Sequence, residues 1–143
     1  MKFASLAVAL WAVPAALCAS SPVSVSWDDV YDNASGSLTT VACSDGDNGM
    51  ITKGFTTFGS LPTFPNIGGA PSITGWNSDQ CGTCWALTAN NVTLHVLAID
   101  TGGKGFNIAL SAMNKLTNGT ARQVGRINAT ATQVNSTLCG LKA

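Results

Sequence analysis

Two closely spaced cysteines, Cys81 and Cys84, constrain the fold of this chain more than any other feature of its sequence. They lie in the segment 75–85, GWNSDQCGTCW, which also holds two glycines and two tryptophans. In a reducing cytosol, a Cys-x-x-Cys pair indicates a redox or metal site, whereas in an exported protein each cysteine more often belongs to a structural disulfide. The compartment of the protein therefore decides how these cysteines are interpreted.

The N-terminus has the three-part layout of a secretory signal peptide. Lys2 precedes an apolar run that extends to Val13, and small residues follow it. The run is too short to span a bilayer, and no transmembrane segment follows, so we expect a secreted, extracellular product. Residues 1–20 are the expected signal peptide, with cleavage between Ala19 and Pro22.

Four cysteines remain if Cys18 leaves with the signal peptide. An even number of cysteines in an oxidising compartment indicates two disulfides, and four cysteines allow three pairings. The mature chain of about 120 residues is long enough to bury a real core, so the disulfides reinforce that core rather than replace it. We expect residues 21–143 to form a single domain. The four cysteines are Cys43, Cys81, Cys84 and Cys139.

The charge of the chain excludes one class of partner. Seven lysines and arginines balance seven aspartates, and there is no glutamate. Binding to nucleic acid needs a concentrated basic face, which this composition does not supply. A weakly charged and rather apolar surface suits sugars, interfaces or self-association instead.

Alternating apolar and polar residues predict short strands over 23–27 and 37–43. Residues 44–70 are rich in Gly, Pro, Asn, Asp and Thr, which predicts long ordered loops, and such loops often carry function. Residues 86–89 and 92–100 form a predicted hairpin around Asn90-Asn91, with the second strand central.

A helix is predicted over residues 108–116, with Asn107 as its cap. Residues 122–134 read as one or two closing strands. Many short strands with one helix and long loops indicate a small β-barrel.

Five segments match the acceptor pattern for N-glycosylation. In so Ser- and Thr-rich a chain, some matches arise by chance, so the pattern indicates surface positions rather than occupancy. The five asparagines are Asn33, Asn91, Asn118, Asn128 and Asn135.

Several motifs in order along the chain strongly resemble those of the cerato-platanin family of small secreted fungal proteins. The resemblance covers nearly the whole mature chain. The motifs are Cys43-Ser44-Asp45-Gly46, the proline- and glycine-rich loop 62–69, the segment 75–85, Gly105-Phe106-Asn107-Ile108, and the segment 112–117.

This resemblance implies a mainly β fold with short helices, a six-stranded double-ψ β-barrel like the first domain of expansins. It also implies the disulfides Cys43–Cys81 and Cys84–Cys139. The implied function is non-hydrolytic binding of chitin-derived (GlcNAc) or cellulosic oligosaccharides, with expansin-like loosening of polysaccharide. Elicitation of plant defence through an immune receptor, and self-association at hydrophobic interfaces, are also associated with the family.

Asp100 ends the most apolar predicted strand, where a carboxylate can sit beside a groove. By resemblance it matches the general acid of expansins and of one endoglucanase family. From the residues alone, the interpretation is structural: an aspartate that accepts hydrogen bonds from loop amides. Glycoside hydrolysis usually needs two carboxylates, and nothing singles out a second aspartate. We therefore expect a vestigial, expansin-like acid in a protein that is not an enzyme. The alternatives are a weak glycoside hydrolase acting on cellulose or chitin through Asp100, and an interface-active, self-assembling protein.

Further residues are candidates for a carbohydrate site. Asp45 and Asn77 lie next to a cysteine or a tryptophan, and either form turns or line a sugar site. Trp76 either stacks on a sugar or packs in the core, and the same choice applies to Trp85. Asn107 either caps the predicted helix or lines the groove beside Asp100.

Other chemistry has weak support. His95, the only histidine, lies in a predicted strand, and the chain lacks the Gly-x-Ser-x-Gly elbow of a hydrolase triad. Zinc would need two close cysteine pairs, and a thioredoxin-like pair should open a helix rather than a strand. We expect no metal and no cofactor.

Overall fold

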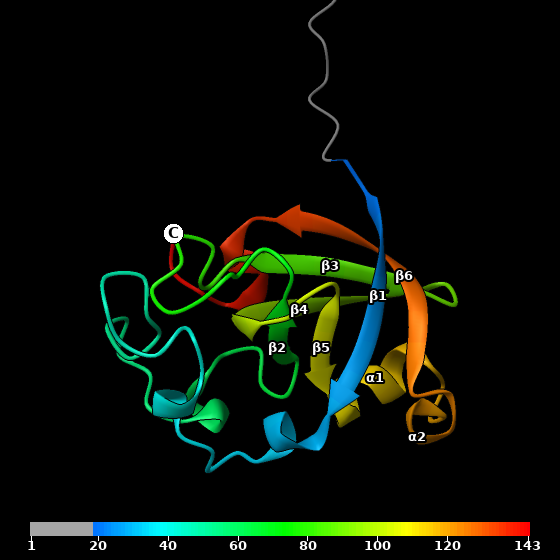
Figure 1. Ribbon diagram of the computed structural model, residues 1–143, viewed down its shortest axis with the longest axis horizontal. Helices are drawn as coiled ribbons and strands as arrows, with labels where there is room; N and C mark the ends of the chain where they lie inside the picture. The colour runs from blue at the N-terminus through cyan, green and yellow to red at the C-terminus, as the bar shows by residue number, and fades with distance from the viewer. Residues whose placement is uncertain (1–18) are drawn as a thin grey trace, which may run out of the picture.

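The computed structural model describes residues 19–143 (Figure 1). The predicted signal peptide lies almost entirely outside these residues, so it stays a prediction. Within residues 19–143, no helix has the length and apolar character needed to cross a membrane.

Six strands close into a barrel in the order β1, β5, β2, β4, β3, β6 (Figure 1). The pairs β1–β5 and β2–β4 are parallel, and the other four pairs are antiparallel. The expected six-stranded barrel is therefore confirmed. The strands are β1 (Ser21–Asp28), β2 (Ile67–Ala70), β3 (Cys84–Ala89), β4 (Val92–Thr101), β5 (Phe106–Ala109) and β6 (Arg126–Val134).

The predicted hairpin is confirmed as β3 and β4. Its turn residues Asn90 and Asn91 have φ angles of 50° and 61°, in the left-handed region that asparagine tolerates better than most residues. β4 pairs with both β2 and β3, so it is central as expected. Its buried side chains are Leu94 and those from Val96 to Ile99.

The strand predicted over 37–43 is wrong. Residues Leu38–Thr40 form a short 3-10 turn, η2, because the Ser37 hydroxyl accepts a hydrogen bond from the Thr39 amide at 3.2 Å. Such a local bond offers the backbone an alternative to a sheet. Leu38 is nevertheless buried, because the loop itself packs on the core.

β2 was not predicted, because it lies inside the segment read as loops. Gly68 and Gly69 give it no alternating pattern of side chains. A Cβ atom at Gly68 would collide with the backbone of Asn107 and Ile108 on β5, so glycine is required there for the two strands to approach. The rest of residues 44–70 consists of ordered loops, as predicted, apart from the short turn η3 (Phe58–Ser60).

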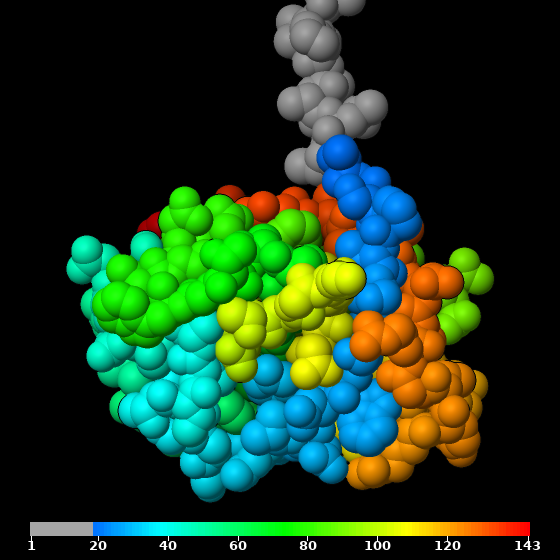
Figure 2. Space-filling model, viewed as in Figure 1, coloured from blue at the N-terminus to red at the C-terminus, as the bar shows by residue number. Residues whose placement is uncertain are grey.

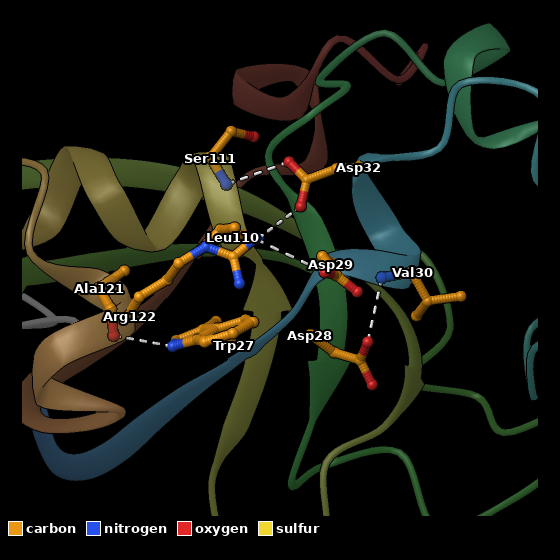
Figure 3. Close-up of polar contacts among 9 residues, drawn as sticks. All are labelled: Trp27, Asp28, Asp29, Val30, Asp32, Leu110, Ser111, Ala121 and Arg122. Carbon is orange, nitrogen blue, oxygen red and sulfur yellow. Dashed lines mark hydrogen bonds and ion pairs between the residues drawn. The ribbon is translucent and has the colours of Figure 1, made fainter.

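The helix predicted over 108–116 begins two residues later than expected. α1 spans Leu110–Leu116, and Asn107 lies in β5, so the predicted Asn107 cap is wrong. The carboxylate of Asp32 performs that role instead, because it accepts hydrogen bonds from the amides of Leu110 at 2.7 Å and Ser111 at 3.0 Å (Figure 3). Asp32 belongs to η1 (Asp29–Asp32), which is far from α1 in sequence.

The C-terminal third contains one closing strand, β6, which pairs with both β1 and β3. A short helix, α2 (Ala121–Val124), precedes it, and Gly125 with a φ of 68° separates the two elements. The prediction of one or two strands over 122–134 therefore holds for its second part only.

Two disulfides fasten the irregular segments to the barrel. Cys43 is bonded to Cys81, and Cys84 to Cys139, which confirms the implied pairing. Cys139 ends η4 (Ser136–Cys139), the last short element of the chain. Figure 2 shows the loops coloured cyan and green packed together as one continuous surface beside the strands.

We expect Asp32→Ala to lower the free energy of unfolding by about 1 kcal/mol, because two amides at the start of α1 lose their acceptor. Urea unfolding followed by circular dichroism measures the change. Asp29→Ala is the matched control, since its ion pair with Arg122, at 3.7 Å, joins two exposed side chains (Figure 3). Equal losses in the two variants would contradict this role for Asp32.

Candidate functional site

Asp100 lies near the end of β4, where its carboxylate joins three parts of the chain. One oxygen, Oδ1, accepts hydrogen bonds from the amides of Ala42 at 3.1 Å and Thr101 at 2.9 Å. The other, Oδ2, accepts a hydrogen bond from the hydroxyl of Tyr31 at 2.9 Å. Three donors thus meet the two oxygens, which suits an ionised carboxylate because it only accepts.

Tyr31 is buried, and its hydroxyl points to Asp100. Burial raises the pKa of Tyr31 above its ordinary value, and the charge and hydrogen bond of Asp100 raise it further, with a smaller effect from Asp28. Tyr31 therefore stays protonated over the physiological range and acts as a fixed donor to Asp100.

The backbone of Ala42 connects Asp100 to a second group of polar residues. Its amide donates to Asp100, while its carbonyl accepts a hydrogen bond from the amide of Asn77 at 3.4 Å. The next residue, Cys43, donates its amide to the carbonyl of Ile99 on β4 and is bonded to Cys81. The structure thus brings Asp100 and Asn77 to either side of one loop segment.

Asn77 and Asn48 hold two loops together. The side-chain oxygen of Asn77 accepts from the Asn48 amide at 2.9 Å, and the Asn48 side chain donates to the Asn77 carbonyl at 3.0 Å. The φ angle of Asn77 is 56°, a left-handed conformation that asparagine adopts at turns. Asn77 therefore forms a turn and also joins its loop to that of Asn48.

Trp76 is the most exposed large apolar side chain in residues 19–143, at 63%. Its indole Nε1 donates a hydrogen bond to Oδ1 of Asp45 at 2.7 Å. This bond lowers the pKa of Asp45, and the Ser44 hydroxyl acts in the same direction. The carboxylate of Asp45 thereby holds an exposed aromatic ring in one orientation.

The other two tryptophans of the described chain have structural roles. Trp85 packs edge-on against Phe106, with ring centroids 5.5 Å apart, and its indole nitrogen bonds to Thr83. Trp27 donates to the carbonyl of Ala121 and carries the guanidinium of Arg122 over its ring (Figure 3). Trp76 is therefore the tryptophan whose ring is available to a ligand.

Asn107 lies on β5, separated from Asp100 by one strand. In the barrel, Gly69 of β2 pairs with Asn107 on one side and with Asp100 on the other. Two strand spacings separate the backbones of these two residues, roughly 10 Å. The side-chain oxygen of Asn107 accepts a hydrogen bond from Ser26 at 3.0 Å.

Hydrogen bonds thus join Asp45 to Trp76, and the backbone of Ala42 joins Asn77 to Asp100. Trp76 and Asn77 are neighbours in the chain, and Asn107 lies across β2 from Asp100. We call Asp45, Trp76, Asn77, Asp100 and Asn107 the polar face. Tyr31, Ala42 and Asn48 also belong to this network of hydrogen bonds, and they were not predicted from the sequence. No local pattern marks them, because the Tyr31–Asp100 bond joins residues 69 positions apart.

Neither a hydrolase triad nor a metal site is present among the described residues. His95 lies within β4 and makes no side-chain hydrogen bond to a serine or an aspartate in residues 19–143. Nor do three metal-binding side chains come together anywhere in this part of the chain.

A family model described as cerato-platanin matches residues 23–141. This chain belongs to the cerato-platanin family. The motifs quoted from the sequence fall within this matched region, which includes most of β1 and all of the other five strands.

Relatives of this cerato-platanin protein support the assignment. The heat-stable 19 kDa antigen of Coccidioides immitis is 46% identical over 146 residues, which cover 99% of this chain and 100% of the antigen. The crystal structure of cerato-platanin 3 from M. perniciosa has a TM-score of 0.81 at 50% identity and covers 85% of this chain and 100% of its own. The solution structure of the fungal elicitor cerato-platanin has a TM-score of 0.74 at 41% identity, covering 82% and 96%. These names are those of an antigen and an elicitor, not of enzymes.

The five acceptor asparagines of this cerato-platanin domain are all exposed. Asn91 lies at the tip of the β3–β4 hairpin, and Asn118 follows α1. None of the five belongs to the polar face, so a glycan on any of them would be attached outside it. Occupancy stays a prediction.

We expect the tyrosinate form of Tyr31 to be absent from the folded protein at pH values where free tyrosine ionises. Because folding raises its pKa, the contribution of Tyr31 to stability is fully present below about pH 10 and is lost as the pH rises further. Tyr31 is the only tyrosine, so near-ultraviolet absorbance follows it alone. In Asp100→Asn, tyrosinate should form at lower pH, because one cause of the raised pKa is gone.

The matched control for this prediction is Tyr31→Phe, whose denaturation midpoint should fall less steeply with pH above about pH 10 than that of the wild type. Identical slopes in the two proteins would contradict the raised pKa.

Proposed function

We propose that this protein is secreted and binds chitin-derived or cellulosic oligosaccharides on the polar face without hydrolysing them. The observation that carries the proposal is the exposed ring of Trp76, held in place by its hydrogen bond to Asp45. An exposed aromatic ring offers a flat apolar surface to the C–H groups of a sugar, while its polar edge stays hydrogen-bonded.

Fixing the ring before binding favours affinity. A tryptophan side chain that must be ordered on binding loses conformational entropy, and this loss reduces the net free energy of association. Here the Asp45 carboxylate has already ordered the ring, and the Cys43–Cys81 disulfide joins the two loops that carry Asp45 and Trp76. The polar face is therefore preorganised.

Sugar hydroxyls need hydrogen-bonding groups that the protein has not already used. In residues 19–143, the side-chain nitrogens of Asn77 and Asn107 have no acceptor, and Oδ2 of Asp45 has no donor. These three groups are available to hydroxyls of a bound chain. Both oxygens of Asp100, by contrast, are engaged by Tyr31, Ala42 and Thr101.

This difference favours binding over hydrolysis. A general acid must present a proton to the leaving oxygen, and a second carboxylate must act as base or nucleophile. The carboxylate of Asp100 is instead an acceptor that holds Tyr31 and the Ala42 segment. We therefore place Asp100 in the site as a positioning residue, and we rank weak glycoside hydrolysis below binding.

A protein that binds single polysaccharide chains competes with the contacts between those chains, so expansin-like loosening follows from the same site. Elicitation of plant defence through an immune receptor is the second part of the proposal. It is supported by one family member's description as a fungal elicitor. Interface activity has less support, because the exposed large apolar side chains are scattered over separate elements. They are Val30, Trp76, Val92, Val124 and Leu138.

We expect Trp76→Ala to weaken binding of chitotetraose about three- to tenfold, because the stacking surface is lost. Isothermal calorimetry and NMR shift mapping of the labelled protein measure the effect. Leu138→Ala, another exposed apolar truncation but on η4, is the control and should leave affinity unchanged. Equal affinity of wild type and Trp76→Ala, for both chitotetraose and cellotetraose, would refute the proposed site.

Asp100→Asn should reduce stability, because the Tyr31 and Ala42 hydrogen bonds lose a charged acceptor. Neither wild type nor variant should release reducing ends from chito- or cello-oligosaccharides on long incubation. If the wild type releases them and the variant does not, hydrolysis through Asp100 replaces non-hydrolytic binding as the function.

A further inference from the structure

One cavity in residues 19–143 has no residue of the polar face among those that line it. Its volume is about 620 Å³, within the range of small-molecule sites. It lies between the loops that precede β2, the segment that precedes β3 and the C-terminal segment. Figure 1 shows the C-terminus beside these loops.

The interior of the cavity is mainly apolar. Phe55 and Pro62 line it from the loop side, and Leu141 lines it from the C-terminal side. Cys81 and Gly82 complete the wall from the segment before β3. Ser136 is the one uncharged polar side chain of the lining.

Both disulfides stiffen this wall. Cys81 is bonded to Cys43, while Gly140 and Leu141 directly follow Cys139, which is bonded to Cys84. A Cβ atom at Gly82 would lie 2.8 Å from the Met50 side chain and 3.5 Å from Leu141, so this wall is already closely packed. The cavity is therefore preformed, and a ligand would not have to order it.

The charges at the cavity are of one sign. Lys53 and Lys142 line it from two segments far apart in the sequence, and no aspartate does. The ammonium of Lys53 reaches only the carbonyl of Asn48, at 3.5 Å. Neither lysine is in a salt bridge, since the only such pair in residues 19–143 joins Arg122 and Asp29.

We propose that this cavity binds a small monocarboxylic acid with an apolar body, of the size of a medium-chain fatty acid. The apolar body fills the space beside Phe55 and Leu141, where its surface is buried away from water. The carboxylate remains near the rim, between the two ammonium groups. This site is separate from the polar face and does not depend on sugar binding.

Octanoate, below its micellar concentration, and the neutral octanol of equal chain length are the probes. NMR titration of the labelled protein should give saturable shifts at Phe55, Gly82 and Leu141, with octanoate binding more tightly than octanol. Lys53→Met and Lys142→Met should each weaken octanoate binding roughly two- to fivefold, and the double variant by about the product. Octanol binding should not change.

Lys104→Met is the matched control, because Lys104 is exposed and does not line the cavity. Ser136→Phe should block the cavity and weaken the binding of both probes. If this variant does not fold, the lysine variants remain as the test.

Absence of saturable octanoate binding, or an unchanged octanoate affinity in the double lysine variant, would overturn the proposal. Octanol binding as tight as octanoate would overturn the role of charge. Added chitotetraose should not displace octanoate.

Discussion

Much of this protein consists of loops, and the four-residue segment from Cys81 to Cys84 fastens two of its irregular segments through disulfides. One cysteine of the segment holds the loop that carries Asp45, and the other holds the C-terminal segment. The disulfides span 38 and 55 residues. By loop-closure entropy each contributes about 4 kcal/mol, in a model that attributes the effect to the unfolded chain. Backbone hydrogen bonds also fix these segments to β4: the Cys43 amide donates to the Ile99 carbonyl, and the Gly82 amide donates to the Ala98 carbonyl.

Asp100, a candidate acid from the sequence, serves in the structure as an acceptor that joins separate segments. Its carboxylate accepts hydrogen bonds from the Tyr31 hydroxyl of η1 and from the amide of Ala42, before Cys43. In the proposed site, the groups left free for a ligand belong to Asp45, Asn77 and Asn107. The sequence indicated Asp100 as a candidate, but its hydrogen-bond donors come from separate segments, so its contacts became apparent only from the structure.

Local signals were sufficient for part of the fold. The Asn90-Asn91 turn and the apolar run after it identify the β3–β4 hairpin, because turn chemistry and strand pattern lie within a few residues. β2 could not be found, because its two central glycines are selected by the approach of β5 and not by a pattern. The prediction of Asn107 as the helix cap was wrong for a similar reason. The amide of Leu110 donates its hydrogen bond to Asp32, which lies 78 residues away in the sequence. The family motifs supplied the pairing of the cysteines, which spacing alone left open.

The closed barrel also limits how copies of this protein can meet. A sheet with free edges presents unpaired amides and carbonyls, and another chain can add to it as an extra strand. Here each of the six strands has a partner on both sides for at least part of its length, so few such edges remain among residues 19–143. This arrangement favours assembly of folded copies through side chains and loops. A cross-β fibril would require the ring of strands to open first.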